Sequence, residues 1–309
     1  MSAAAALVLG RRRRGALAGD WKGWLAAVLL LLAVGGLIVE VARSRNVRWG
    51  AIGEYLFDPT ILAGVRLTLV FTVLSMLLGI VIGIVLAFMR LARNPVLANF
   101  SRLYIWFFRG TPLLVQIIFW FNIQLFIPRV QIGPFDVETN TLIPPFTAAL
   151  LALSLNEGAY MAEIVRGGLL SVGKGQTEAA DALGLSRAHT MRLIILPQAM
   201  RVIVPPIGNQ SISMLKTTSL VSVVAAQDLL TRVENIYAKN FLIIELLIVA
   251  SIWYLVLTTL ASIGQHYIER RLGRGFAETR SRGARPVDSD ADATLRNPIG
   301  PQDADRELF

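Results

Sequence analysis

Long apolar segments separated by short polar stretches make up most of the chain up to residue 263. A helix that crosses roughly 30 Å of hydrocarbon needs about 20 consecutive, mostly apolar residues. The segments that approach or exceed this length are 24–41, 61–89, 111–127, 145–168, 197–224 and 241–263. The pattern therefore predicts an all-α, polytopic membrane protein with about six transmembrane helices.

Two of these segments contain features that disturb a simple helix. An amphipathic stretch, 96–108, leads into the third segment, and its aromatic residues predict an anchor at the membrane interface. Pro205-Pro206 and Gly208 predict a break in the fifth helix. Backbone groups freed by a break are tolerated in a membrane where protein or a water-filled cavity receives them, so the break favours a translocation path. A proline kink inside a packed helix is an equally common alternative.

Basic residues near the ends of the segments predict the orientation in the membrane. With the N-terminus in the cytoplasm, 22 Lys and Arg residues fall on the cytoplasmic side and 8 on the outer side. The positive-inside rule selects this arrangement, which places both termini and the 169–196 loop in the cytoplasm. Arg11 to Arg14, followed by an apolar stretch, also fit a secretory signal. Because 24–41 is long for such a signal and no small-x-small site follows Val41, we expect an uncleaved helix.

Composition excludes several classes of function. The chain is 54% hydrophobic and 17% charged, which is too apolar for an ordinary soluble domain. Without cysteine it has no disulfides, thiolate metal sites or cysteine nucleophiles, and His189 and His266 are its only histidines. The net charge of +9 is dispersed at the ends of apolar segments, so we do not expect nucleic-acid binding. No metal site, cofactor or catalytic residue is predicted.

One stretch has the glycine and lysine spacing of a phosphate-binding loop. It runs from Gly168 to Gly173-Lys174, but residue 175 is glycine where the motif requires the Mg²⁺-binding Ser or Thr. An apolar span also precedes it, where the motif requires a buried strand. We therefore expect that the chain does not hydrolyse ATP itself.

The polar segment 175–197 is unusual in so apolar a chain. Glu178-Ala179-Ala180 open a short helix, with acidic side chains near its N-terminal end. Gly184 supplies the positive φ that ends a helix, and Ser186 caps a second short helix. Leu196-Pro197 marks the return into the membrane. The arrangement favours a docking site for a cytoplasmic protein over a plain solvated loop.

The spacing in this segment resembles the EAA loop of ABC importer permeases. Glu178-Ala179-Ala180 is followed by three residues, Gly184, nine residues, Ile194, one residue and Leu196-Pro197. The coupling residues that this resemblance implies are Glu178, Ala179, Ala180, Gly184, Leu196 and Pro197. The loop alone leaves phosphonate and sugar permeases open.

Three further stretches narrow the resemblance to the permeases for polar amino acids, of the histidine and glutamine type. Residues 109–116 (RGTPLLVQ), 159–168 (AYMAEIVRGG) and 216–220 (KTTSL) are similar to the RGTPLLVQ, AY-x-AE-x-x-RGG and K-x-TSL stretches of that family. The resemblance covers about residues 60–270. Thr177 stands where many relatives have an aromatic residue, and the N-terminal span and long tail depart from the shorter five-span members.

The resemblance implies a domain organisation and a set of partners. Residues 59–273 would form the five-helix core of a type I ABC importer permease, after an N-terminal segment, 1–58, with one extra transmembrane helix. The tail, 274–309, is expected to be disordered in the cytoplasm. The partners implied are cytoplasmic ATPase subunits, an extracytoplasmic solute-binding protein and a second permease subunit, identical or a sister. The chain would import amino acids across a bacterial inner membrane.

A polar stripe follows the fourth segment. Asn156, Tyr160 and Glu163 fall within a 60° arc of a helix, and Glu157 lies at its border near the middle of the membrane. An ionised carboxylate at that depth costs roughly 2.5–3.5 kcal/mol, so we expect it to face a cavity or a partner such as Arg109, Arg166 or Lys216. The predicted translocation-path residues are Asn156, Glu157, Tyr160, Glu163, Asn209 and Lys216.

Other interpretations of this stripe remain open. It is also compatible with a structural polar cluster that holds helices together. A stand-alone transporter would use Glu157 and Glu163 as a proton site and would work without any ATPase. An enzyme acting on lipids is not favoured, because the sequence offers no nucleophile with a base beside it.

Overall fold

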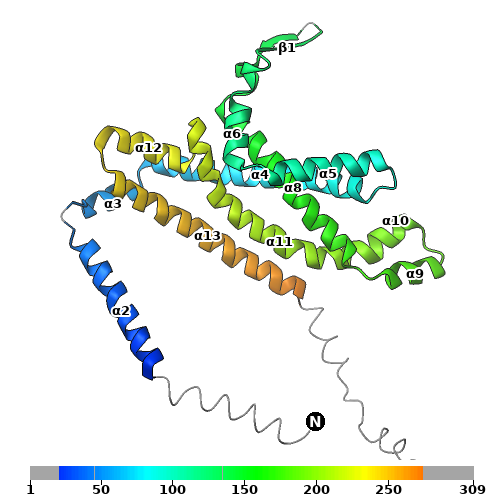
Figure 1. Cartoon of the computed structure of the whole chain (residues 1–309), viewed down its shortest axis with the longest axis horizontal. Coiled ribbons are helices and arrows are strands. Elements are labelled where there is room, and N and C mark those ends of the chain that lie inside the picture. Colours follow the sequence, from blue (N-terminus) through cyan, green and yellow to red (C-terminus); the bar gives the residue numbers. More distant parts are fainter. Residues whose placement is uncertain (1–20, 45, 134, 274–309) are drawn as a thin grey trace, which may run out of the picture.

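The computed structural model describes residues 21–44, 46–133 and 135–273, which are mostly helical (Figure 1). The α-helices are α2 (Trp21–Ala42), α3 (Trp49–Leu56), α4 (Pro59–Leu91), α5 (Pro95–Gly110), α6 (Leu113–Phe121), α7 (Thr139–Leu142), α8 (Pro145–Leu170), α9 (Lys174–Ala182), α10 (Arg187–His189), α11 (Leu196–Thr217), α12 (Leu229–Asn240) and α13 (Ile243–Gly273). Shorter elements are the 3₁₀-helices η1 (Ile123–Leu125) and η3 (Thr218–Val224), the π-helix η2 (Thr190–Ile195) and the antiparallel strands β1 (Arg129–Ile132) and β2 (Phe135–Glu138). The all-α prediction is confirmed.

The predicted number of spans is not confirmed. Within the described residues, the helical segments long and apolar enough to cross a membrane are Pro59–Leu91, Pro145–Leu170, Arg187–Val224 and Ile243–Arg271. Helices α5 and α6 add a fifth span if they are counted together as one bent pair. Helix α2 contains a shorter apolar stretch, Gly23–Leu37, and lies apart from the other helices (Figure 1).

The apolar run that predicted the third span is not a single straight helix. Helix α5 ends at Gly110, Pro112 precedes α6, and the two helices are bent by 101°. At 1.5 Å per residue, the 9 residues of α6 extend only about 14 Å, which is too short to cross the hydrocarbon alone. Helix α5 instead packs across α4 and α8, with Ala98, Ser101 and Ile105 buried.

The predicted break in the fifth span is wrong. Pro205 and Pro206 lie inside α11, which is continuous, and the irregular backbone lies at its two ends in η2 and η3. A proline lacks the backbone N–H, so Pro205 and Pro206 leave the carbonyls four residues earlier, those of Arg201 and Val202, without their usual helical donors. Gln265 of α13 contacts the same stretch at other acceptors, and donates its Nε2 to the Pro205 carbonyl (3.3 Å) and to the Asn209 side chain (3.1 Å). Helix α13 thus braces this part of α11.

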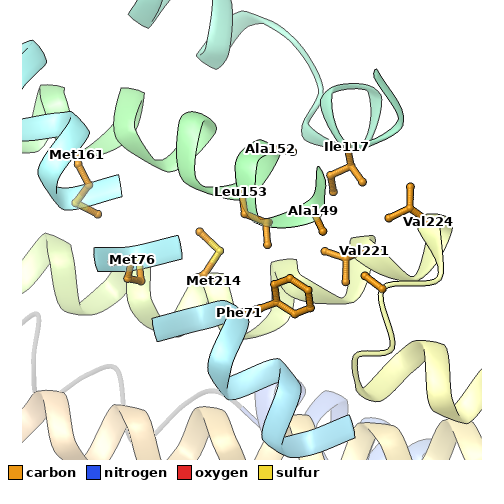
Figure 2. Close-up of a cluster of buried hydrophobic side chains, with 11 residues drawn as sticks. Phe71, Met76, Ile117, Ala149, Ala152, Leu153, Met161, Met214, Val221 and Val224 are labelled. Carbon is orange, nitrogen blue, oxygen red and sulfur yellow. The ribbon is translucent and has the colours of Figure 1, made fainter. Parts of the chain in front are cut away.

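The main hydrophobic core joins α4, α6, α8, α11 and η3 (Figure 2). Phe71 of α4 is fully buried and stacks on Phe146 of α8 with ring centroids 4.7 Å apart. Its other members include Met76, Ile117, Leu153, Met161, Met214 and Val221. This core holds α8 and α11, the two helices on either side of the polar 175–197 segment, at fixed positions against α4.

A second core attaches α3 to the ends of α12 and α13. The Trp253 indole donates to the Leu56 carbonyl (2.8 Å), and Asn240 donates to the Tyr55 hydroxyl (3.2 Å). Helix α3 therefore packs on α13 although it lies inside the predicted N-terminal segment, 1–58. The division at residues 58 and 59 stays a prediction. The basic residues before Trp21 and the predicted tail, 274–309, lie outside the described residues.

Candidate transport and coupling sites

The 175–197 segment forms a compact cap at the end of the bundle away from α3 and α12 (Figure 1). Helix α9 begins at Lys174, one residue after Gly173, whose extended backbone starts the helix. Glu178 therefore lies in the middle of α9 and not in its first turn, which corrects the expected start. Helix α9 packs against η2, and Gln198 of α11 donates to the Gln176 side chain (3.3 Å).

The turn after α9 has the geometry that its glycine predicts. Gly184 has a φ of +69°, a left-handed conformation that residues with a Cβ rarely adopt. The Leu185 N–H bonds to the Ala180 carbonyl (3.1 Å), and the Gly184 N–H bonds to the Asp181 carbonyl (3.0 Å). These two bonds make a Schellman motif, which satisfies carbonyls left free at the end of the helix.

The second short helix begins where predicted. Ser186 is the N-cap of α10, and its Oγ accepts a hydrogen bond from the His189 backbone N–H (3.4 Å). The chain continues through η2 into α11 at Leu196, the predicted point of return. Of the predicted coupling residues, Ala180 is buried (1% exposed) and packs within the cap. The exposed members are Glu178, Ala179, Gly184, Leu196 and Pro197.

A cavity of about 310 Å³ lies between α6, α8, η3 and the second half of α11. Its apolar lining comes from Leu113, Met214 and Leu220. The polar residues that line it are Asn156, Glu157, Tyr160, Gln210, Ser213 and Thr217.

Glu157 is the acidic residue of this cavity and is 5% exposed. Gln210 of α11 donates its Nε2 to the two carboxylate oxygens at 3.2 and 3.5 Å, which links the two helices that flank the cap. The ion pairs of the described residues are Arg129–Asp136 and Arg166–Glu163, and neither includes Glu157. The carboxylate at the cavity wall therefore has an amide partner but no basic side chain within ion-pair distance.

Asn156 and Gln116 close the sharp bend between α5 and α6. The carbonyls at the end of α5 have no helical partner. Gln116 donates its Nε2 to the Phe108 carbonyl (3.0 Å), the Thr111 carbonyl (3.1 Å) and the Thr111 hydroxyl (2.7 Å). Asn156 donates to the same Phe108 carbonyl (2.7 Å). Asn156 thus reaches the cavity but also holds the bend.

Of the remaining predicted path residues, Tyr160 lines the cavity, whereas Glu163, Asn209 and Lys216 lie outside its lining. Tyr160 lines the cavity, with the Arg109 guanidinium over its ring at 5.0 Å. Glu163 bonds to Arg166 at 2.6 Å, one turn farther along α8. Asn209 faces Gln265 of α13, and Lys216 is exposed and outside the cavity lining.

The α11 residues that line the cavity were not among the predicted path residues, although Asn209, next to Gln210, was. Gln210, Ser213 and Thr217 are spaced i, i+3 and i+7, which places them on one face of a helix. This spacing can be read from the sequence, but it marks one helix face only if the helix is continuous, and a break near Pro206 was expected. Gln116 lies inside the RGTPLLVQ stretch, where only the bent structure reveals its role.

Comparisons with known proteins agree on one family. Residues 79–274 match the model of the binding-protein-dependent transport system inner membrane component family. The arginine transport system permease protein ArgU of Corynebacterium glutamicum is 41% identical over 272 residues, covering 87% of this chain and 85% of that protein. The glutamine transport system permease protein GlnP of Escherichia coli K12 is 38% identical over 224 residues, covering 72% of this chain and 97% of that protein.

Solved structures share the fold. The crystal structure of an amino acid ABC transporter with histidines has a TM-score of 0.64 and 33% identity, and covers 73% of this chain and 99% of that one. An inward-facing structure of the MetNI methionine ABC transporter has a TM-score of 0.56 at 20% identity, a likeness of fold alone. The chain therefore belongs to the binding-protein-dependent transport system inner membrane components, the membrane-spanning permease subunits of ABC transporters, and is not an enzyme.

Proposed function

We propose that this permease subunit imports amino acids into the cytoplasm of a bacterium, and that a separate ATPase drives it through the 175–197 cap. One observation carries the proposal. Helices α8 and α11, which flank the cap, also form the two polar walls of the cavity. A displacement of the cap by ATP turnover would therefore move Glu157 relative to Gln210.

The surface of the cap supports its role as the coupling element. Glu178 and Ala179 are exposed on α9, so a partner can contact them directly. Ala180 and the Schellman motif at Gly184 fix α9 to the rest of the cap, so a push on α9 is transmitted to η2 and α11. Leu196 and Pro197 begin α11, which receives the movement.

The lining of the cavity supports the proposal that the substrate carries a positive charge. A carboxylate inside a membrane span is costly unless an opposite charge or hydrogen bonds compensate it. Glu157 receives hydrogen bonds only from the neutral Gln210 amide among the described contacts, so a cationic ligand would complete the site. The ammonium group of any amino acid supplies such a charge, and the guanidinium of arginine supplies a second. We therefore propose amino acids as substrates, with basic ones preferred.

The proposed assembly contains other chains. Family membership implies an ATPase and a solute-binding protein, and we propose that two permease subunits, this chain and an identical or sister copy, cross the membrane together. We further propose that residues 59–273 form the permease domain and that the cap and both termini face the cytoplasm. The solute-binding protein would then meet the opposite side, where α3 and α12 lie (Figure 1).

Two substitutions on α9 test the coupling role. Glu178→Lys reverses an exposed charge and Ala179→Trp adds bulk to an exposed position, and neither disturbs a buried contact. We expect both variants to accumulate in the membrane but to lose amino-acid uptake. Glu138→Lys, an exposed charge reversal on β2, is the matched control and should retain uptake. Normal uptake in both α9 variants would contradict the coupling role.

A stand-alone proton-coupled transporter remains the main alternative, and its test is independent. It requires Glu157 and Glu163 to act together, whereas Glu163 is held by Arg166 at 2.6 Å. The purified chain in liposomes should move no amino acid along a proton gradient until the ATPase and ATP are added. Transport without the ATPase would favour the alternative.

A further inference from the structure

Two glycines on α4 lie where that helix meets α8 most closely. Gly79 and Gly83 are four residues apart, so they share one face of α4 and allow close approach of the two backbones. They face different parts of α8. A Cβ at Gly83 would lie 2.3 Å from the Cβ of Met161, in the hydrophobic core. A Cβ at Gly79 would instead meet Glu157, the acidic residue of the cavity.

The contact at Gly79 involves the side chain that points toward the cavity. A Cβ at this position would lie 2.8 Å from the Glu157 Cγ and 2.9 Å from its Cβ. Carbon atoms do not approach so closely, because the contact lies inside the van der Waals distance of about 3.5–4.0 Å. Rotation about the Cα–Cβ bond can move the Cγ, but the Cβ is fixed to the α8 backbone, so α8 must also shift. The carboxylate is then displaced from its observed position beside Gln210.

We infer that Gly79 is a positioning residue for substrate selection: the absence of a side chain there sets where the Glu157 carboxylate lies in the cavity. This inference rests on the proposed substrate site. It assigns to Gly79 a role that Gly83 does not have, although both glycines permit the same helix contact. Gly79 itself is not among the residues that line the cavity, so it acts only through Glu157.

The test compares two substrates in whole cells that carry the complete transporter. Arginine and citrulline have nearly the same shape, but citrulline has a neutral ureido group in place of the guanidinium. The measured quantity is the ratio of their uptake efficiencies, Vmax/KM for arginine over Vmax/KM for citrulline, normalised to the amount of protein in the membrane. Because the same solute-binding protein supplies every variant, a change in this ratio between variants reports on the permease.

Glu157→Gln first tests the site itself. Loss of a charge-assisted contact should lower the ratio by about tenfold or more. If Glu157→Gln leaves the ratio unchanged, the proposed substrate site fails, and the role of Gly79 fails with it.

Gly79→Ala and Gly83→Ala then separate positioning from packing. Gly79→Ala should lower the ratio toward the value measured for Glu157→Gln. The double variant, Gly79→Ala with Glu157→Gln, should have the same ratio as Glu157→Gln alone, because Gly79 acts only through Glu157. Gly83→Ala should reduce the amount of protein or the uptake of both substrates, with the ratio within about twofold of the original. Equal loss of both substrates in Gly79→Ala, with an unchanged ratio, would overturn the inference while leaving the substrate site intact.

A third variant keeps the test decisive if the alanine variants fail to accumulate. Glu157→Asp retains the charge and adds no atom against α4, but withdraws the carboxylate by one methylene. If position decides selection, this variant should lower the ratio although the charge is intact. An unchanged ratio in Glu157→Asp would mean that the position of the carboxylate is unimportant, and would overturn the inference.

Discussion

Replacing Gln116 with leucine tests how the bend between α5 and α6 is held. Gln116 is 5% exposed, and leucine has a similar volume but no hydrogen-bond donor. The amide Nε2 lies 2.7–3.1 Å from three acceptors, the Thr111 hydroxyl and the carbonyls of Phe108 and Thr111. An amide has two N–H groups, so two full hydrogen bonds are made at a time.

The expected cost follows from these contacts. A hydrogen bond inside a protein contributes about 0.5–1.5 kcal/mol net, so the loss of two lowers the free energy of unfolding by about 1–3 kcal/mol. In the Gln116→Leu variant the Phe108 carbonyl still accepts a hydrogen bond from Asn156 (2.7 Å). The loss of stability at this carbonyl should therefore be smaller than for a buried carbonyl left with no donor. The Thr111 carbonyl has no such second donor among the described contacts.

The measurement is the free energy of unfolding in mixed micelles, followed by tryptophan fluorescence as denaturing detergent is added. Gln131→Leu is the control, because Gln131 is exposed on β1 and its substitution should change the free energy by less than about 0.5 kcal/mol. If Gln116→Leu is no more destabilising than Gln131→Leu, the amide does not hold the bend.

Three further predictions concern the cap, the core and the start of α12. Gly184→Val should cost about 1–2 kcal/mol at a φ of +69° and raise amide hydrogen exchange at Leu185; unchanged exchange would contradict the Schellman motif. Phe71→Ala should lower the free energy of unfolding by about 3–5 kcal/mol, and a loss below 1 kcal/mol would argue against this core. Burial raises the pKa of the Asp228 carboxyl, so its contribution to stability is largest at pH values below its ordinary pKa and falls as pH rises. Asp228→Asn should therefore gain stability relative to the original chain as pH rises above the ordinary carboxyl pKa of about 4, and a difference that does not change with pH would contradict this.

Features encoded by a few neighbouring residues were predicted well. The second and fourth apolar segments end within two residues of α4 and α8, because uninterrupted apolar runs with polar flanks mark those helices directly. The turn at Gly184 and the helix N-cap at Ser186 were also predicted, since each depends on one residue type at one backbone position.

Features that depend on distant contacts were not predicted. The bend at residues 110–112 is stabilised by Asn156, which lies about 45 positions later in the sequence. The contact between α11 and α13 beside the two prolines involves Gln265, in a different helix. The pairing of Glu157 with Gln210 requires knowledge of how α8 faces α11. No local pattern contains this information.

Site-directed crosslinking from α9 tests the central claim most directly, and a chain with no cysteine of its own makes it feasible. Ala179→Cys places a thiol on the exposed face of α9, and Val130→Cys places one on β1 as the control. A bifunctional thiol reagent applied to native membranes should join Ala179→Cys, but not Val130→Cys, to an ATPase subunit identified by mass spectrometry. Absence of the ATPase from the Ala179→Cys product, or labelling of that thiol by a reagent confined to the outer side, would contradict the proposed coupling.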